Sequence, residues 1–177
     1  MGNGKIYDGA PIENLYGTDL SLDLAEKGYD LFNDREALKS QFIEANFLDD
    51  NSTLVKHFAG QFSIVNAMSF FHLFNYETQK IAAKRIVTLL RPQPGSVLVG
   101  RHVGQRVPGG YGDAALLGYR HNEKSWKEFW DVIGQETGTK WSVEAHAEPL
   151  SLQVSKGFQD LQGDGGLVKL KFTVRRV

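Results

Sequence analysis

Four side chains suited to proton transfer or anion binding lie between residues 72 and 121: His72, Arg101, His102 and His121. An imidazole with an unperturbed pKa of about 6.5 can accept or donate a proton near neutral pH. A guanidinium can hold a carboxylate or an enolate through two parallel hydrogen bonds. We therefore predict that these four residues are catalytic and perform acid–base chemistry on a small-molecule substrate. The alternative for each histidine is a structural or surface role.

The stretch 62–74, FSIVNAMSFFHLF, is predicted to position part of this chemistry. Its apolar run ends in small and polar residues and then in an aromatic cluster. This pattern is typical of a buried parallel strand whose carboxyl end opens onto a ligand crevice. Core packing is the alternative role for the aromatic residues. The predicted substrate-binding residues, which would shape an apolar cavity, are Ser69, Phe70, Phe71, Tyr111 and Trp126.

Composition excludes several classes of function. The net charge of −1, from 20 basic and 21 acidic residues, gives no electrostatic reason to expect nucleic acid or an anionic membrane as a partner. The chain has no cysteine, and no His, Asp or Glu pair has ligand spacing on a predicted helix, so we expect no metal site. No apolar run reaches about 18 residues and no signal-peptide core is present, which favours a soluble, cytoplasmic protein.

The elements that must position these residues follow from periodicity and from capping residues. Strands are predicted at 15–19, at 42–45, at the start of 62–74, and at 96–101, 141–147 and 167–176. Helices are predicted at 21–32, 52–58, 75–90 and 122–136, with a glycine-rich loop at 102–121. Strand–helix alternation followed by a terminal strand pair predicts an α/β fold: a three-layer sandwich with a mostly parallel sheet and a terminal antiparallel strand. We expect residues 1–177 to form one domain.

Several segments, in order, resemble one family. GTDLSLDLAEKGYDLF, QFIEANFLDD, FSIVNAMSFFHLF, AAKRIVTLLRPQPGSVLVGR and YRHNEKSWKEFWDVIGQETGTKWSVEA are similar to fungal class I S-adenosylmethionine-dependent methyltransferases. The resembling group methylates meroterpenoid and polyketide intermediates. The resemblance covers about residues 5–148 and implies a Rossmann-like class I methyltransferase fold.

The resemblance also implies a cofactor site. Asp19 stands where the family's acid receives the ribose hydroxyls of the cofactor, and a carboxylate accepts two hydroxyl donors well. Asn46 and Phe47 match the positions that contact adenine, and Asn66 lies near the expected place of the methyl donor. The loop 102–121 falls where the family builds its substrate wall. For Asp19 the alternative is a turn or helix-cap carboxylate.

The sequence departs from the family at its beginning. The family's first strand and glycine-rich turn would precede GKIYDGAP, whereas this sequence begins at Met1. Gly2 and Gly4 do not restore a G-x-G-x-x-G turn, since no strand precedes them. Because that turn holds the methionine half of the cofactor, we expect an incomplete fold with little affinity for S-adenosylmethionine. A strand missing from the middle of the sheet also favours a homodimer.

Three functions remain open at this point. The favoured one is a non-methylating enzyme of fungal secondary metabolism, without a cofactor, that catalyses a cyclisation, isomerisation or pericyclic step on a small apolar intermediate. The second is an S-adenosylmethionine-dependent O-methyltransferase completed by domain swapping or by a partner chain. The third is a non-catalytic partner or fragment. The capped helices and the clean alternation of 167–176 favour a sequence that still specifies one fold over the third hypothesis.

Overall fold

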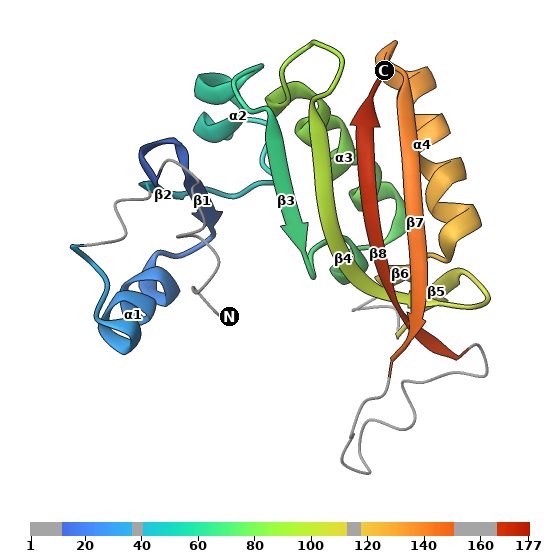
Figure 1. The fold of residues 1–177 in the computed structure, drawn as a ribbon, viewed down its shortest axis with the longest axis horizontal. Helices are drawn as coiled ribbons and strands as arrows, with labels where there is room; N and C mark the ends of the chain where they lie inside the picture. The colour runs from blue at the N-terminus through green and yellow to red at the C-terminus, as the bar shows by residue number, and fades with distance from the viewer. Residues whose placement is uncertain (1–11, 37–40, 113–117, 151–165) are drawn as a thin grey trace. The chain divides into compact units, whose positions relative to one another are not determined.

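The computed structural model describes residues 12–36, 41–112, 118–150 and 166–177. The chain groups into two compact units, unit 1 (Met1–His57) and unit 2 (Phe58–Val177), whose elements are labelled in Figure 1. Two compact units can belong to one domain, so the single domain stays a prediction. Among the described residues, no helix combines the length and the apolar composition needed to cross a membrane.

Unit 1 is built around a strand–helix–strand motif. A short 3-10 helix, η2 (Ile12–Asn14), precedes β1 (Tyr16–Asp19), helix α1 (Asp23–Phe32) and β2 (Gln41–Glu44). The two strands are parallel, with Tyr16 opposite Gln41 and Asp19 opposite Glu44. Gly17 allows the Phe42 ring to approach, because a Cβ there would lie 2.6 Å from a ring carbon. The Tyr29 ring of α1 packs edge-on against the Phe42 ring, with the ring centroids 5.8 Å apart. This contact packs the helix against the strand pair. Helix α2 (Thr53–Phe58) follows.

Unit 2 contains a four-stranded mixed sheet in the order β3-β4-β8-β7. Its strands are β3 (Ile64–Met68), β4 (Val97–Gln105), β7 (Trp141–Pro149) and β8 (Leu167–Arg176). β3 and β4 are parallel, whereas β8 lies between β4 and β7 and is antiparallel to both. The predicted α/β fold and the antiparallel final strand are therefore confirmed. Because β8 is antiparallel to both of its neighbours, two of the three strand pairings in this sheet are antiparallel and one is parallel.

Two capped helices cover one face of this sheet. Both α3 (Tyr76–Leu89) and α4 (Glu123–Thr137) lie behind the strands in Figure 1. The Asn75 side chain accepts a hydrogen bond from the Thr78 amide at the start of α3. Asn122 and Ser125 form a capping box at the start of α4, and Gly138 ends that helix in the left-handed conformation with φ 65°. Asn75 and Asn122 stand at the predicted helix starts, whereas the reciprocal bond from Ser125 was not predicted.

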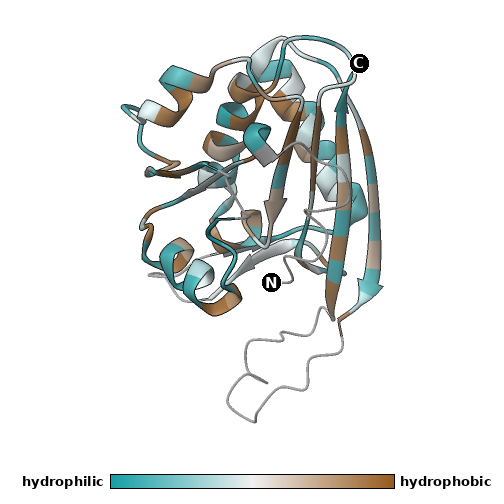
Figure 2. Ribbon diagram, turned by 60° about the vertical axis from the view of Figure 1, so that its left-hand side comes forward, coloured by the Kyte–Doolittle hydropathy of each residue, from teal (hydrophilic) through white to brown (hydrophobic). Residues whose placement is uncertain are grey.

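The strands bury alternate side chains under these helices, and Figure 2 shows the alternation of hydropathy along the long strands. On β8 the buried set is Val168, Leu170, Phe172 and Val174. On β4 the buried positions from 98 to 104 are Leu98, His102 and Gly104, with Gly100 between them. The residues between them, such as Arg101 and Lys171, point to the other face, because successive side chains of a strand alternate. Among the described residues of unit 2, the helices therefore cover one face of the sheet, and we call the opposite face the open face.

The segment 102–121 is predicted as a loop, but most of its described residues lie in strands. β4 continues to Gln105, because residues 102–105 pair with Leu167–Leu170 of β8. A hairpin of β5 (Gly109–Tyr111) and β6 (Gly118–Arg120) follows. A short 3-10 helix, η3 (Phe71–Leu73), links β3 to α3. The hairpin and η3 thus follow the carboxyl ends of the two parallel strands of unit 2.

Candidate functional site

In unit 1, the structure brings Asp19 and Asn46 to the same edge of the parallel strand pair. Asp19 ends β1 opposite Glu44, and its carbonyl accepts a hydrogen bond from the Ala45 amide at 2.9 Å. Asn46 comes directly after Ala45, with its Oδ1 accepting from the Leu48 amide at 2.9 Å. Both polar side chains are exposed, whereas Phe47 is half-buried. This edge therefore offers a carboxylate and an amide to a ligand beyond the carboxyl ends of β1 and β2.

In unit 2, Asn66 and Arg101 share a groove of about 530 Å³ on the open face of the sheet. Asn66 lies on β3 opposite Val99, and Arg101 lies on β4 opposite Met68. Both polar residues are exposed. The groove combines an apolar border with polar groups, which is the usual composition of a small-molecule site.

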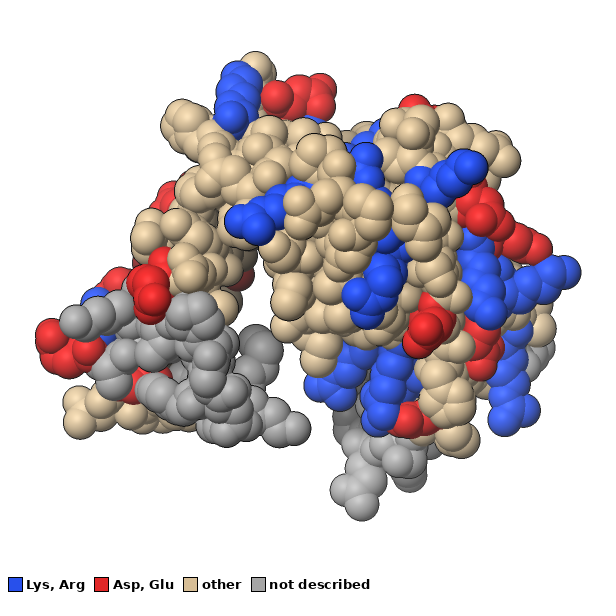
Figure 3. Space-filling model, turned by 45° about the horizontal axis from the view of Figure 1, so that its top comes forward, with Lys and Arg blue, Asp and Glu red and all other residues tan. Residues whose placement is uncertain are grey.

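Basic side chains cross this groove in one row. Arg101 is directly opposite Lys171, which is in turn opposite His146. Like charges at opposed positions repel, and Glu148 offsets part of this by pairing with both Lys171 and Lys169. Its hydrogen bond to Lys171, followed by that to Lys169, lowers the Glu148 pKa to about 2. Figure 3 shows Lys and Arg side chains gathered with acidic side chains among them.

The predicted catalytic set is divided between the two faces of the sheet. Arg101 lies on the open face, whereas His102 points under the helices and is 3% exposed. Consecutive strand residues cannot face the same site, so Arg101 does not act beside His102. Among the described residues, neither ring nitrogen of His102 has a hydrogen-bond partner. Burial, helped by the nearby rings of His121 and His72, lowers the His102 pKa to about 3.

His121 is held by hydrogen bonds at both ring nitrogens. Its Nε2 lies 3.1 Å from Gln79 Oε1, and its Nδ1 lies 3.1 Å from Ser125 Oγ. The side chain is 1% exposed, and burial lowers its pKa to about 4. His121 is therefore uncharged at neutral pH, and both of its ring nitrogens are occupied by hydrogen bonds within the protein. Sequence reasoning missed its partner Gln79, which is fully buried in the first turn of α3.

The segment between β3 and α3 begins with a strained residue. Ser69 has φ 54°, in the left-handed region, and is exposed; its amide donates to the Arg101 carbonyl at 2.7 Å. Such a conformation in a residue other than glycine costs free energy and often occurs at functional sites. His72 follows on η3 and is half-buried. Burial, with a smaller contribution from the Arg120 charge, lowers the His72 pKa.

The β5–β6 hairpin is hydrogen-bonded to the segment between β3 and α3. The Tyr111 hydroxyl donates to the His72 carbonyl at 2.5 Å, and the Arg120 guanidinium lies 3.5 Å from the centroid of the Tyr111 ring. The Tyr119 amide donates to the Phe74 carbonyl at 2.9 Å. We call the half-buried rings of these two segments the aromatic wall: Phe70, His72, Phe74, Tyr111 and Tyr119.

Two predicted substrate-binding residues lie elsewhere. Phe71 and Trp126 are both 0% exposed, and their rings meet edge-on at 5.1 Å in the core between sheet and helices. The Phe71 ring also packs edge-on against Phe70 of the aromatic wall, with centroids 5.6 Å apart, and neither Phe71 nor Trp126 has surface for a ligand. Ser69, Phe70 and Tyr111 are accessible, and their roles as ligand contacts stay predictions.

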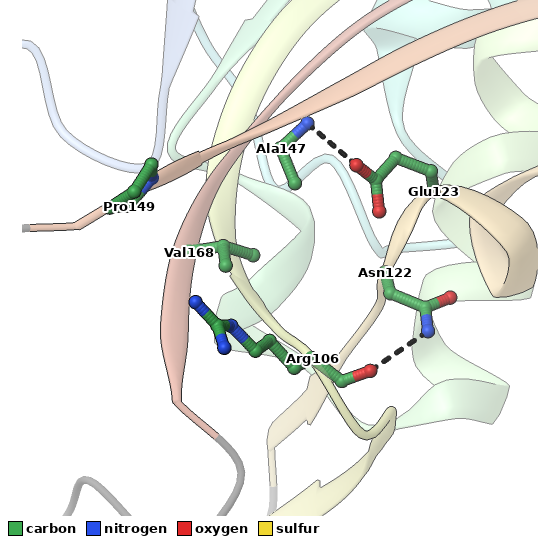
Figure 4. Close-up of a pocket in the computed structure, with 6 residues that line it drawn as sticks. All are labelled: Arg106, Asn122, Glu123, Ala147, Pro149 and Val168. Atoms are coloured by element: carbon green, nitrogen blue, oxygen red, sulfur yellow. Dashed lines mark hydrogen bonds between the residues drawn. The ribbon is translucent and has the colours of Figure 1, made fainter.

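A smaller pocket of about 270 Å³ lies beside the start of α4 and includes none of the predicted site residues. Figure 4 shows Glu123 accepting a hydrogen bond from the Ala147 amide and Asn122 donating to the Arg106 carbonyl, at 2.9 and 3.0 Å. These bonds tie the beginning of α4 to β7 and to the end of β4.

The chain is similar in sequence to fungal methyltransferases. It is 44% identical over 167 residues to the O-methyltransferase phiE of Fungal sp. (strain ATCC 74256), covering 93% of this chain and 54% of that protein. It is 46% identical over 141 residues to the methyltransferase adrK of Penicillium roqueforti, covering 78% and 51%. The O-methyltransferase atr3 of Stereocaulon alpinum is 36% identical over 176 residues, covering 97% and 49%. The chain thus spans about half the length of these relatives. No family model matches the sequence.

Solved structures show the same fold at low sequence identity. The 1,6-didemethyltoxoflavin-N1-methyltransferase of Burkholderia thailandensis, solved with S-adenosylhomocysteine, superposes with a TM-score of 0.59 at 14% identity, covering 93% of this chain and 61% of that chain. The [4+2]-cyclase SpnF superposes with a TM-score of 0.61, also at 14% identity, covering 90% of this chain and 64% of that chain. At such identity, these similarities speak for the fold alone.

These comparisons correct two expectations. The favoured non-methylating cyclase or isomerase is wrong, because relatives at 36–46% identity are named methyltransferases. The expectation of no cofactor falls with it, since methyltransferases of this fold, such as the Burkholderia enzyme, bind S-adenosylhomocysteine. The Rossmann-like fold and the similarity to fungal enzymes, in contrast, are confirmed. The chain is a class I S-adenosylmethionine-dependent methyltransferase-like protein, related in sequence to fungal methyltransferases.

Proposed function

We propose that this chain acts in S-adenosylmethionine-dependent O-methylation of a small-molecule intermediate of fungal secondary metabolism. The observation that carries the proposal is the 44% identity to the O-methyltransferase phiE across 93% of the chain. Identity at this level over nearly the whole chain indicates common ancestry in addition to a common fold. The activity of a whole enzyme remains part of the proposal, because the chain spans about half of its relatives.

The polar edge of unit 1 supports a cofactor role. Asp19 offers an exposed carboxylate that can accept hydrogen bonds from two hydroxyl groups, as a ribose provides. Asn46 keeps a second lone pair on Oδ1 for an exocyclic amine, since the Leu48 amide uses one. The donor and acceptor types at this edge therefore fit the adenosine half of the cofactor. When bound, S-adenosylmethionine would supply the methyl group for the acceptor oxygen.

The residues of unit 2 would serve the methyl acceptor. The aromatic wall presents half-buried rings after the carboxyl ends of β3 and β4, where ligands of open α/β sheets bind. His72 supplies the imidazole of the wall, and its lowered pKa keeps that imidazole neutral and able to take a proton from an acceptor hydroxyl at neutral pH. Arg101 and Asn66, in the groove on the open face, can hold polar groups of a ligand.

Titration calorimetry of the purified chain with S-adenosylhomocysteine tests the cofactor assignment. We expect binding, and at least tenfold weaker binding after Asp19→Asn. Asp131→Asn, on the exposed side of α4, is the matched control and should leave the affinity unchanged. An absence of binding at millimolar ligand, or equal affinities for both variants, would contradict the proposal.

We also propose that two copies associate through β3. Among the described residues β3 pairs only with β4, and its Ile64 and Met68 side chains are 63% and 45% exposed. An uncovered edge with apolar side chains is a template for pairing. Sedimentation velocity should show a dimer that Ile64→Lys dissociates. A monomer at every concentration of the wild-type chain would contradict this proposal.

A further inference from the structure

One buried side chain connects the two segments of the aromatic wall. Gln79 is 0% exposed, and its Nε2 donates to the Phe74 carbonyl at 2.9 Å and to the Tyr119 carbonyl at 2.8 Å. Phe74 closes the segment after β3, and Tyr119 belongs to β6 of the hairpin. These segments are far apart in sequence, and Gln79 reaches both from the first turn of α3.

The two carbonyls also determine the orientation of the amide. A carbonyl only accepts hydrogen bonds, so the NH2 group of Gln79 must face Phe74 and Tyr119. Its Oε1 then faces His121 Nε2 at 3.1 Å and needs a donor there. His121 is therefore the neutral tautomer that carries its proton on Nε2. The direction of this bond follows from chemistry, without reference to hydrogen positions.

The same reasoning extends to helix α4. Because His121 Nδ1 carries no proton in this tautomer, it accepts from the Ser125 hydroxyl at 3.1 Å. Ser125 Oγ in turn accepts from the Asn122 amide at 3.0 Å, and the Ser125 amide donates to Asn122 Oδ1 at 2.8 Å. One chain of hydrogen bonds thus runs from the wall, through α3, to the capping box of α4.

We propose that Gln79 is a positioning residue for the methyl acceptor, which fixes the aromatic wall by holding Phe74, Tyr119 and the Nε2–H tautomer of His121 together. This rests on the proposed function, since the wall is the surface given to the acceptor. Gln79 touches no ligand itself. It acts by keeping the two segments of the wall in one arrangement, because each of its polar atoms has a fixed partner.

The test compares the wild-type chain with Gln79→Met, which keeps the length of the side chain and removes its hydrogen bonds. Gln135→Met, at an exposed position of α4, is the matched control. Nitrogen NMR of the histidine rings should show His121 protonated on Nε2 in the wild-type chain and in the control. Amide exchange of Tyr119, which donates to Phe74, should be at least tenfold faster in Gln79→Met, with unchanged protection in β7 and β8.

A hydroxylated aromatic probe, 1-naphthol, relates this arrangement to binding. We expect naphthol to perturb the resonances of the wall and to bind at least fivefold more weakly to Gln79→Met. The affinity for S-adenosylhomocysteine should be the same in both chains. If the wild-type chain does not bind S-adenosylhomocysteine, the proposed function is contradicted. The His121 tautomer and the Tyr119 exchange rate would still test whether Gln79 holds the two segments together.

Three results would overturn the assignment of Gln79: a wild-type His121 protonated on Nδ1, Tyr119 exchange that does not change in Gln79→Met, or naphthol affinity that is equal in both chains. If Gln79→Met does not fold, Gln79→Glu keeps the shape of the side chain. Its carboxylate next to His121 Nε2 favours the imidazolium, so the His121 ring should titrate at a higher pH than in the wild-type chain. An unchanged titration of His121 in that variant likewise contradicts the proposal.

Discussion

The two buried histidines of unit 2 should make the protein unstable in mild acid. Burial lowers the pKa of His102 from 6.5 to about 3 and that of His121 from 6.5 to about 4. Because each pKa is lower in the folded chain than in the unfolded chain, the unfolded chain binds more protons in acid. Stability is therefore constant above pH 6.5 and falls as the pH drops below it.

The magnitude follows from the size of the shifts. One pKa unit corresponds to about 1.4 kcal/mol, so protonation of each histidine in the unfolded chain should lower the free energy of unfolding by about 2.5 kcal/mol between pH 7.0 and pH 4.5. The two together give about 5 kcal/mol, which is comparable to the whole stability of many domains. The pKa values of Glu136 and Glu148 are also lowered from 4.5, so the stability that these carboxylates contribute is lost mainly below pH 4.5 and adds little to the effect above it.

The assay is urea unfolding, followed by circular dichroism, at pH 7.0, 5.5 and 4.5. His102→Leu should lose about half of the pH dependence. It should also be about 1–3 kcal/mol more stable at pH 7, because it replaces two buried nitrogens without partners by a methyl-bearing side chain. His146→Gln, at an exposed position of β7, should behave like the wild-type chain. Equal pH dependence in the wild-type chain and His102→Leu would refute the reasoning.

Three further substitutions test local features by the same unfolding assay. Ser69→Val should cost about 1–2 kcal/mol, because a β-branched residue strongly disfavours the φ of 54° found there, whereas an unchanged midpoint would contradict the strain. Gly118→Ala should cost about 1–3 kcal/mol, since the new Cβ would lie 2.5 Å from atoms of the Tyr111 ring; a tolerated alanine would mean that this ring moves freely. Asn122→Ala should cost about 1 kcal/mol by removing the capping box of α4, and a neutral result would show that Ser125 holds the helix start alone.

Local signals in the sequence predicted the elements that depend on neighbouring residues. Asn75 and Asn122 cap the helices as expected, and Gly138 ends α4 in the left-handed conformation. The alternation from 167 to 176 predicts both β8 and its buried face. Asp19 and Asn46 also lie at one strand edge, because Asp19 ends the first predicted strand and Asn46 follows the second, which is parallel to it.

The remaining features depend on contacts between distant residues. The β5–β6 hairpin is rich in glycine and has no alternation, so its strands follow from pairing alone. The sequence predicts a strand that ends at Arg101, whereas β4 continues to Gln105, so Arg101 and His102 are consecutive strand residues that point to opposite faces. Gln79 resembles any polar residue in a first helical turn, and only the fold shows it between Phe74 and Tyr119.

The place of β8 in the sheet also has a consequence for synthesis. β8 lies between β4 and β7, although it follows every other element of unit 2 in the chain. While the polypeptide is being made, β7 has no strand to pair with and β4 has an uncovered edge until residues 167–176 emerge from the ribosome. Contacts between distant residues form slowly, and unpaired edges aggregate, so the nascent chain is exposed to misassembly until β8 has been made. We therefore expect chaperones to bind the nascent chain mainly between the synthesis of β7 and that of β8.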